Sequence, residues 1–181
     1  MVDKGHLHRG FKPVHWCLDC GSALAEAEVE YRDKQSSAVD VAFPFVDAAE
    51  ASRRLGSTAK GRLELAIWTT TPWTLPANRG VALAPNLQYV LLKAEDRHVL
   101  VAEALAEACA QRFGLASLEV DGGAMGADLE GLMLVTPFGN APVPIVLGDH
   151  VTTETGTGCV HTAPAHGLED FEMGRRYDLE V

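Results

Sequence analysis

Two prolines in a threonine-rich segment place the strongest limit on how this chain can fold. The segment runs from Trp68 to Asn78 and has four threonines within six residues. Because Pro72 and Pro76 fix φ and lack a backbone donor, neither a ladder strand nor a helix should continue through them. We therefore expect a stiff, extended loop that displays hydroxyl groups beside aromatic side chains. A threonine-rich edge strand that enters a turn is the alternative.

Short alternating apolar runs predict strands on both sides of this segment. Leu63, Leu65 and Ile67 alternate directly before it, which points the three side chains to one face of a strand. Pro44 ends a similar run and indicates an edge strand or a bulge. The runs that we assign to strands cover residues 39–45, 63–67, 81–84, 88–93, 132–134 and 143–147.

One helix is predicted over residues 99–113, where alanine and glutamate dominate. Its apolar face would include Val101, Leu105 and Cys109, and Gly114 would form the C-terminal cap. Residues 47–56 fit a short helix or a loop, and the glycines at 122, 123 and 126 predict a flexible turn. Many short strands with frequent glycine and proline favour an α+β fold with a β-barrel-like domain.

Composition narrows the class of protein further. The 181 residues are 47% hydrophobic, enough for one domain with a sizeable core, and no apolar run is long enough to cross a bilayer. The first residues lack the apolar stretch of a signal peptide, and four cysteines are too few for a disulfide framework. We expect a cytoplasmic protein without a membrane partner. The net charge of −10 argues against autonomous nucleic-acid binding.

A CxxC turn, Cys17 to Cys20, lies in the N-terminal arm that we assign to residues 1–22, ahead of a single domain over 23–181. A structural zinc ion needs four ligands, commonly two such pairs. The remaining cysteines, Cys109 and Cys159, are isolated in the sequence. We therefore expect no zinc here, and a tight turn whose second half-site is lost or lies elsewhere is the favoured interpretation.

A second informative stretch runs from Gly156 to Phe171. The sequence predicts His161 on a short strand and Asp170 in the first turn of a helix over 168–177. A turn between them would let the two side chains converge on one pocket. Such a pair can transfer protons, or can bind an ammonium group and shape a pocket wall. The alternative is a satisfied, partly buried histidine and an aspartate favoured by the helix dipole.

Together the two stretches resemble the editing insertion, connective polypeptide 1, of isoleucyl-tRNA synthetases. The first peptide matches 68–78 and the second 156–170, and residues 12–31 look like the start of the insertion. Valyl and leucyl enzymes have arginine where this chain has Thr71, which favours the isoleucyl branch. Glu169 stands where relatives often have aspartate. The chain lacks the family's synthetic motifs and looks like an excised editing domain.

The resemblance implies an aminoacyl-tRNA deacylase that hydrolyses valine wrongly attached to isoleucine tRNA, and possibly valyl-adenylate. Asp170 would pair with the substrate ammonium group, and His161 would help to exclude isoleucine. Thr69, Thr70 and Thr71 would act at the ester, and the remaining substrate contacts would come from Trp68, Thr74 and Asn78.

Editing would then need no cofactor, since ATP and magnesium serve only the absent synthetic domain. The implied partners are the 3′ aminoacyl end of isoleucine tRNA, bound weakly in isolation, and the rest of the synthetase. A non-catalytic tRNA-docking module, with zinc at Cys17 and Cys20, is the competing hypothesis.

Overall fold

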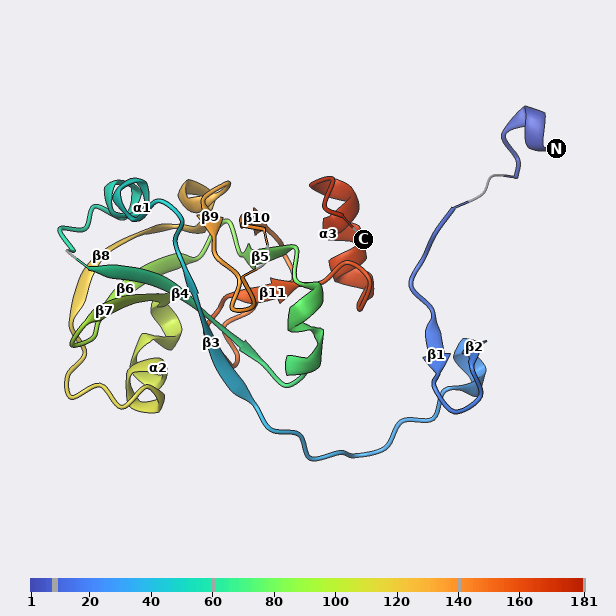
Figure 1. Cartoon of the computed structure of the whole chain (residues 1–181), viewed down its shortest axis with the longest axis horizontal. Coiled ribbons are helices and arrows are strands. Elements are labelled where there is room, and N and C mark those ends of the chain that lie inside the picture. The colour runs from blue at the N-terminus through green and yellow to red at the C-terminus, as the bar shows by residue number, and fades with distance from the viewer. Residues whose placement is uncertain (8–9, 60, 140, 181) are drawn as a thin grey trace.

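The computed structural model describes residues 1–7, 10–59, 61–139 and 141–180. Within them, the packed body begins at residue 39 and holds two sheets (Figure 1). The larger sheet has the order β3-β4-β7-β6-β8, formed by Val39–Pro44, Arg62–Thr69, Arg97–Ala102, Gln88–Lys93 and Val120–Met125. The smaller has the order β11-β5-β10-β9, formed by Val160–Thr162, Gly80–Leu83, Val143–Leu147 and Met133–Leu134.

Helices connect these strands and cover the larger sheet. Helix α1 (Ala48–Leu55) packs on β4 and β8, and α2 (Ala106–Arg112) packs on β6 and β7. Helix α3 (Leu168–Arg176) follows β11 near the end of the chain, beside the smaller sheet in Figure 1. Three 3-10 turns lie between the strands of the body: η3 (Pro72–Ala77), η4 (Glu103–Leu105) and η5 (Gly126–Leu129).

The N-terminal arm is longer than the predicted residues 1–22: the described part of residues 1–34 stands apart from this body (Figure 1). It contains η1 (Val2–Lys4), the hairpin of β1 (His15–Cys17) and β2 (Ser22–Leu24), and η2 (Glu26–Glu28). The CxxC turn joins the two strands of the hairpin, and the backbone N–H of Cys20 donates to Cys17 Sγ at 3.2 Å. The predicted division between residues 22 and 23 coincides with the start of β2, so the hairpin spans it.

The strand ahead of the threonine-rich segment is buried on both faces. Leu63, Leu65 and Ile67 are buried as expected, but Glu64 on the other face is also fully buried. β4 lies between β3 and β7, and Arg62 and Arg97 form ion pairs with the Glu64 carboxylate. β4 is therefore buried on both faces because it is a central strand. Its C-terminal end holds the first threonine in a fixed position.

Several local predictions are confirmed. β3 is an edge strand that ends at Pro44, where the missing N–H costs no ladder hydrogen bond. Residues 47–56 form the short helix α1, because Asp47 accepts hydrogen bonds from the N–H groups of Ala49 and Glu50 at 3.0 Å each. Gly56 ends the helix with a φ of 60°.

The predicted helix over residues 99–113 is wrong in its first half. Residues 97–102 form β7, in which Val99 and Val101 pair with Leu92 and Val90 of β6. β-branched side chains favour this setting, and the α-helix begins only at Ala106. Cys109 is fully buried, as its place on the apolar face predicted.

The predicted flexible turn at residues 122–126 is also wrong, because these residues form β8 and the start of η5. The glycines are needed for close approach: a Cβ on Gly123 would lie 2.6 Å from the Tyr89 carbonyl oxygen, and one on Gly126 would lie 2.0 Å from that of Ala84. The α+β class is confirmed. Among the described residues the strands form separate sheets and no closed barrel.

Candidate functional site

The threonine-rich segment connects the two sheets. β4 belongs to the larger sheet and β5 to the smaller, and η3 lies between them. The expected extended loop is therefore wrong for residues 72–77, which form a 3-10 helix. Pro72 stands at its N-terminus, where no N–H is required and a fixed φ suits a helical start. β11 pairs with β5, and this brings His161 opposite Val81 and close to η3.

The first three threonines differ in what their hydroxyls do. Thr69 is buried, and its Oγ1 accepts from the Thr71 N–H at 3.0 Å and lies 3.2 Å from Thr71 Oγ1. The Thr70 carbonyl accepts from the Ser36 hydroxyl at 2.8 Å. Among the described residues the Thr70 hydroxyl has no such partner, and it is exposed. Thr70 therefore offers the most available hydroxyl of the three.

His161 is held in a buried polar network. Its Nε2 lies 2.9 Å from Thr74 Oγ1, which donates its only proton to the Thr71 carbonyl at 2.9 Å. The hydroxyl must therefore accept from Nε2–H. Asn78 Nδ2 donates to the Gly80 carbonyl at 2.8 Å and lies 3.4 Å from His161 Nδ1. These contacts assign a neutral imidazole with its proton on Nε2.

Burial stabilises the same protonation state. It lowers the pKa of His161 below the ordinary value, because charging the ring inside the protein costs hydration energy, and the nearby Asp170 carboxylate offsets this only in part. A neutral, fixed ring is suited to supporting the residues that surround it, and less suited to taking a proton.

Asp170 is placed differently, at the start of α3. Its Oδ2 accepts from the Ala163 N–H at 2.9 Å, and this is its only hydrogen bond among the described residues. Burial raises the pKa of the Asp170 carboxyl, while the Ala163 hydrogen bond and nearby His161 and His150 act against that rise. The other carboxylate oxygen has no hydrogen-bond partner among the described residues.

A cavity of about 240 Å3 lies beside these residues. Trp68, Thr69 and Thr70 form one side, and the loop from Thr155 to Val160 forms another. Glycine is required where the loop meets the body: a Cβ on Gly156 would lie 3.2 Å from Trp68 Cβ, and one on Gly158 would lie 2.3 Å from Ala102 Cβ. The prediction that these glycines allow close approach is confirmed.

The structure thus divides the predicted residues into three groups. Three line the cavity, namely Trp68, Thr69 and Thr70, whereas Thr71, Thr74, Asn78 and His161 form the network behind them. Asp170 is electrostatically coupled to His161 and lies outside the cavity wall. Sequence reasoning missed His150, Thr152 and Thr155 as lining residues. The run of hydroxyl residues just before Gly156 is the sequence feature from which these lining residues could have been predicted.

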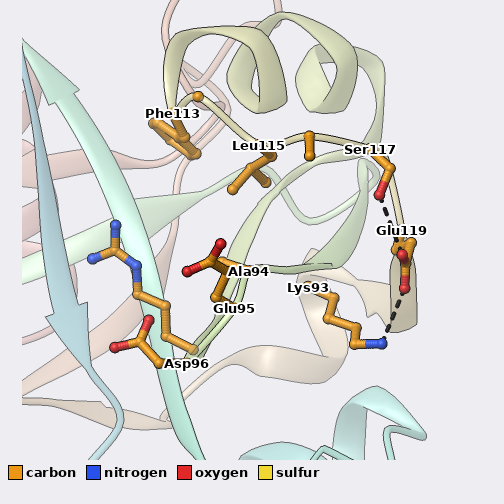
Figure 2. A pocket seen from close by; sticks show the side chains of 11 residues that line it. Lys93, Ala94, Glu95, Asp96, Phe113, Leu115, Ser117 and Glu119 are labelled. Carbon is orange, nitrogen blue, oxygen red and sulfur yellow. Dashed lines mark hydrogen bonds and ion pairs between the residues drawn. The ribbon is translucent and has the colours of Figure 1, made fainter.

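A larger hollow of about 470 Å3 lies elsewhere, between the turn after β6 and the loop after α2 (Figure 2). Lys93 forms an ion pair with Glu119, which also accepts from the Ser117 hydroxyl. Glu95 and Asp96 add further charge. None of the predicted site residues lines this hollow, so size alone does not identify the site.

Two further features of the described residues concern metal ligation and membrane crossing. No group of three or more histidine, cysteine or acidic side chains is placed to hold a metal ion there. The described helices include none with the length and apolar character required to cross a membrane.

The packed body matches a known protein family in sequence and a solved structure in fold. A family model described as "Leucyl-tRNA synthetase, editing domain" matches residues 40–181. The cytosolic leucyl-tRNA synthetase editing domain of P. falciparum has a similar fold, with a TM-score of 0.68 at 11% identity, covering 78% of this chain and 66% of that one.

Relatives identified by sequence similarity align with the N-terminal arm as well as with the body. The isoleucine–tRNA ligase of Alcanivorax borkumensis is 59% identical over 99% of this chain, and that of Halorhodospira halophila is 57% identical over 100%. The chain spans 20% of the length of each. These matches confirm the resemblance to isoleucyl-tRNA synthetases. The chain belongs to the family of aminoacyl-tRNA synthetase editing domains.

Proposed function

We propose that this chain is a deacylase that removes valine from isoleucine tRNA. Water would add to the ester carbonyl of the valyl group. The bond to the terminal ribose oxygen would then break, that oxygen would take the proton, and free valine and tRNA would leave. Such a step is useful because a synthetic pocket discriminates one methylene by roughly 1–3 kcal/mol, a limit for which isoleucyl-tRNA synthetase is itself the standard example.

The Asp170 carboxylate is the observation that carries this proposal. It is anchored through one oxygen by the Ala163 N–H, and the other oxygen has no partner among the described residues. A charge-assisted hydrogen bond to an α-ammonium group would use that oxygen. The bond would orient the amino acid, and with it the ester carbonyl.

The cavity beside the threonines would receive the reacting ester. The exposed Thr70 hydroxyl can donate to or accept from a ribose hydroxyl, the carbonyl or the attacking water. Thr69 and Thr71 fix the backbone around it. Because an aminoacyl ester is already activated, orientation of water can supply much of the rate without a strong base. A neutral His161 fits this division of roles.

The rest of the synthetase would deliver the tRNA. With a net charge of −10, this chain is poorly suited to bind tRNA alone, and we propose contact with the 3′ aminoacyl end only. ATP and magnesium would be used by the synthetic part, and the deacylation would need no cofactor and no zinc. The relatives that cover the whole chain are bacterial ligases, and we propose a cytoplasmic setting.

Hydrolysis of valyl- and isoleucyl-tRNA for isoleucine by this chain tests the proposal. We expect faster loss of the valyl ester, and loss of that activity in Asp170→Ala. A folded chain that binds a valyl-adenosine ester without hydrolysing it at any concentration would overturn the proposal. That outcome would favour a docking module instead.

A further inference from the structure

The carbonyl groups of the loop Gly156–Thr157–Gly158 all point into the protein body. Arg112 Nη2 donates to the Gly156 carbonyl at 3.1 Å, and the Ala102 N–H donates to that of Thr157 at 2.8 Å. The buried Tyr89 hydroxyl donates to the Gly158 carbonyl at 2.8 Å. Three consecutive carbonyls are thus held by three different elements.

This arrangement fixes the direction of the loop's N–H groups. In a trans peptide unit the carbonyl of one residue and the N–H of the next point in opposite directions, and the described chain has no cis peptide bond. The Gly156 carbonyl points at α2, so the Thr157 N–H points away from it. Likewise, the Thr157 carbonyl points at Ala102, so the Gly158 N–H points away from the end of β7.

Neither N–H has a hydrogen-bond acceptor among the residues that the structure describes. Both residues are almost completely buried, and both line the 240 Å3 cavity. A backbone donor in such a place normally has a partner, because leaving it unpaired costs free energy. Both N–H groups are therefore without an acceptor among the described residues, and a ligand bound in the cavity can supply one.

We propose that the backbone N–H groups of Thr157 and Gly158 form an oxyanion hole for the ester that is hydrolysed in this cavity. This rests on the deacylase function proposed above. When water adds to the ester carbonyl, the carbonyl oxygen takes up the electron pair of the broken π bond and becomes an anion. Two fixed donors stabilise that anion more than the neutral carbonyl, and both bonds are released when the ribose oxygen leaves.

Arg112 is a positioning residue in this scheme. It holds the Gly156 carbonyl and is itself held by Asp40 through two hydrogen bonds of 2.6 and 2.9 Å. Asp40 stands opposite Trp68 in the pairing of β3 with β4. One ion pair therefore ties the loop to the strand that carries the threonines, so the donors and the hydroxyls keep their separation.

The direct test removes a single N–H by replacing Gly158 with glycolic acid, which makes the 157–158 link an ester. The chain can be assembled by ligation at two natural cysteines, from segments 1–108, 109–158 and 159–181. We expect kcat for the valyl ester to fall about 100-fold with KM changed less than threefold. Binding of an anionic tetrahedral phosphonate analogue should weaken more than binding of the planar amide analogue.

The matched control carries the same glycine-to-glycolic-acid change at Gly131. That N–H donates to the Ile145 carbonyl at 2.9 Å, and Gly131 does not line the cavity. This variant loses a structural hydrogen bond and should keep its kcat. Arg112→Gln, which needs no synthesis, should lower kcat about tenfold with KM nearly unchanged.

The outcomes separate the two proposals. If the unmodified chain hydrolyses no aminoacyl ester, the deacylase function fails and the oxyanion hole fails with it. If the unmodified chain is active and the Gly158 ester variant retains kcat within threefold, only the oxyanion hole is overturned. Equal loss of kcat in the Gly131 control would likewise overturn it, because a general structural effect would then explain the change.

Discussion

The two acid–base residues of the site occupy opposite kinds of surroundings. On β11, His161 has both ring nitrogens engaged, by Thr74 and Asn78, and burial lowers its pKa. At the start of α3, Asp170 has one oxygen engaged and one free among the described residues, and burial raises its pKa. The difference separates a fixed ring in the network behind the cavity from a carboxylate that has one oxygen without a partner among the described residues.

The two surroundings arise within nine residues, because His161 lies on β11 and Asp170 lies at the start of α3. The turn between His161 and Asp170 lets β11 join the smaller sheet while α3 turns back toward it. The strand supplies rigidity through its pairing with β5, and the helix start supplies an incompletely satisfied carboxylate. The following variants test whether the two residues are as different as their contacts indicate.

The largest effect is expected from Asp170→Asn. The amide keeps the size of the side chain and can still accept from the Ala163 N–H, but it loses the charge. Valyl-ester hydrolysis should fall about 100-fold, as expected for the loss of one charge-assisted hydrogen bond of about 3 kcal/mol. Steady-state deacylation measures this, with the exposed neighbour changed in Glu169→Gln as control. Similar losses of valyl-ester hydrolysis in both variants would contradict a specific role for the Asp170 carboxylate.

His161→Ala should change selectivity more than rate. Removing the ring that supports the cavity lining should enlarge the site and raise isoleucyl-ester hydrolysis relative to valyl-ester hydrolysis about tenfold, within the range expected for one methylene. Removing the buried ring should also lower the free energy of unfolding by about 1–3 kcal/mol. Parallel assays of both esters and urea unfolding give the two numbers, and His166→Ala, an exposed site, is the control. A fall in both rates without a change in their ratio would instead indicate an acid–base role.

The pH dependence of stability should be a smaller effect than those of the two substitutions above. Its sign should be opposite for His161 and for Asp170. A lowered His161 pKa means that the unfolded chain binds more protons just below pH 6.5, so its contribution to stability is lost as pH falls through that region. A raised Asp170 pKa means that its contribution is lost as pH rises above 3.8. Urea unfolding at pH 7 and pH 5 should therefore show a smaller penalty for His161→Gln at pH 5. A larger penalty at pH 5 would show that the folded protein favours the charged ring.

The smallest effect should follow removal of residues 1–34. The described part of this arm contributes no residue to the buried core, and Ser36, which holds the Thr70 carbonyl, is kept. The melting temperature should change by less than about 2 °C, as expected for loss of little packed surface. Calorimetry measures it, with Ser36→Ala in the full chain for comparison. A drop of about 10 °C would show that the arm packs on the body.

The sequence predicted two informative stretches, and the structure brings them together: Thr74 lies 2.9 Å from His161, and Trp68 lines one cavity with Gly156. The roles of the individual side chains stay predictions, and the local shape of the first stretch differs from the expected loop. The 3-10 helix after Thr71 was missed because proline was taken only as a breaker, although it suits the first helical position.

The larger errors came from neighbours that a single sequence does not reveal. Residues 97–102 contain alternating valines, but the alanine-rich helix that follows obscured them. Gly123 and Gly126 were interpreted as flexible, whereas the Tyr89 and Ala84 carbonyls leave no space for a side chain. His150 and Thr155 line the cavity because the chain before β11 folds against the end of β4, a contact between segments far apart in the sequence.

The hydrogen bond between Thr74 and His161 joins residues 87 positions apart in the chain. Closing so long a loop is costly in entropy and is typically slow. During synthesis the threonine-rich segment leaves the ribosome long before β11 and α3, so its hydroxyls must wait for their partners. The network that holds His161 therefore cannot form until β11, which follows the other described strands in the chain, has been synthesised.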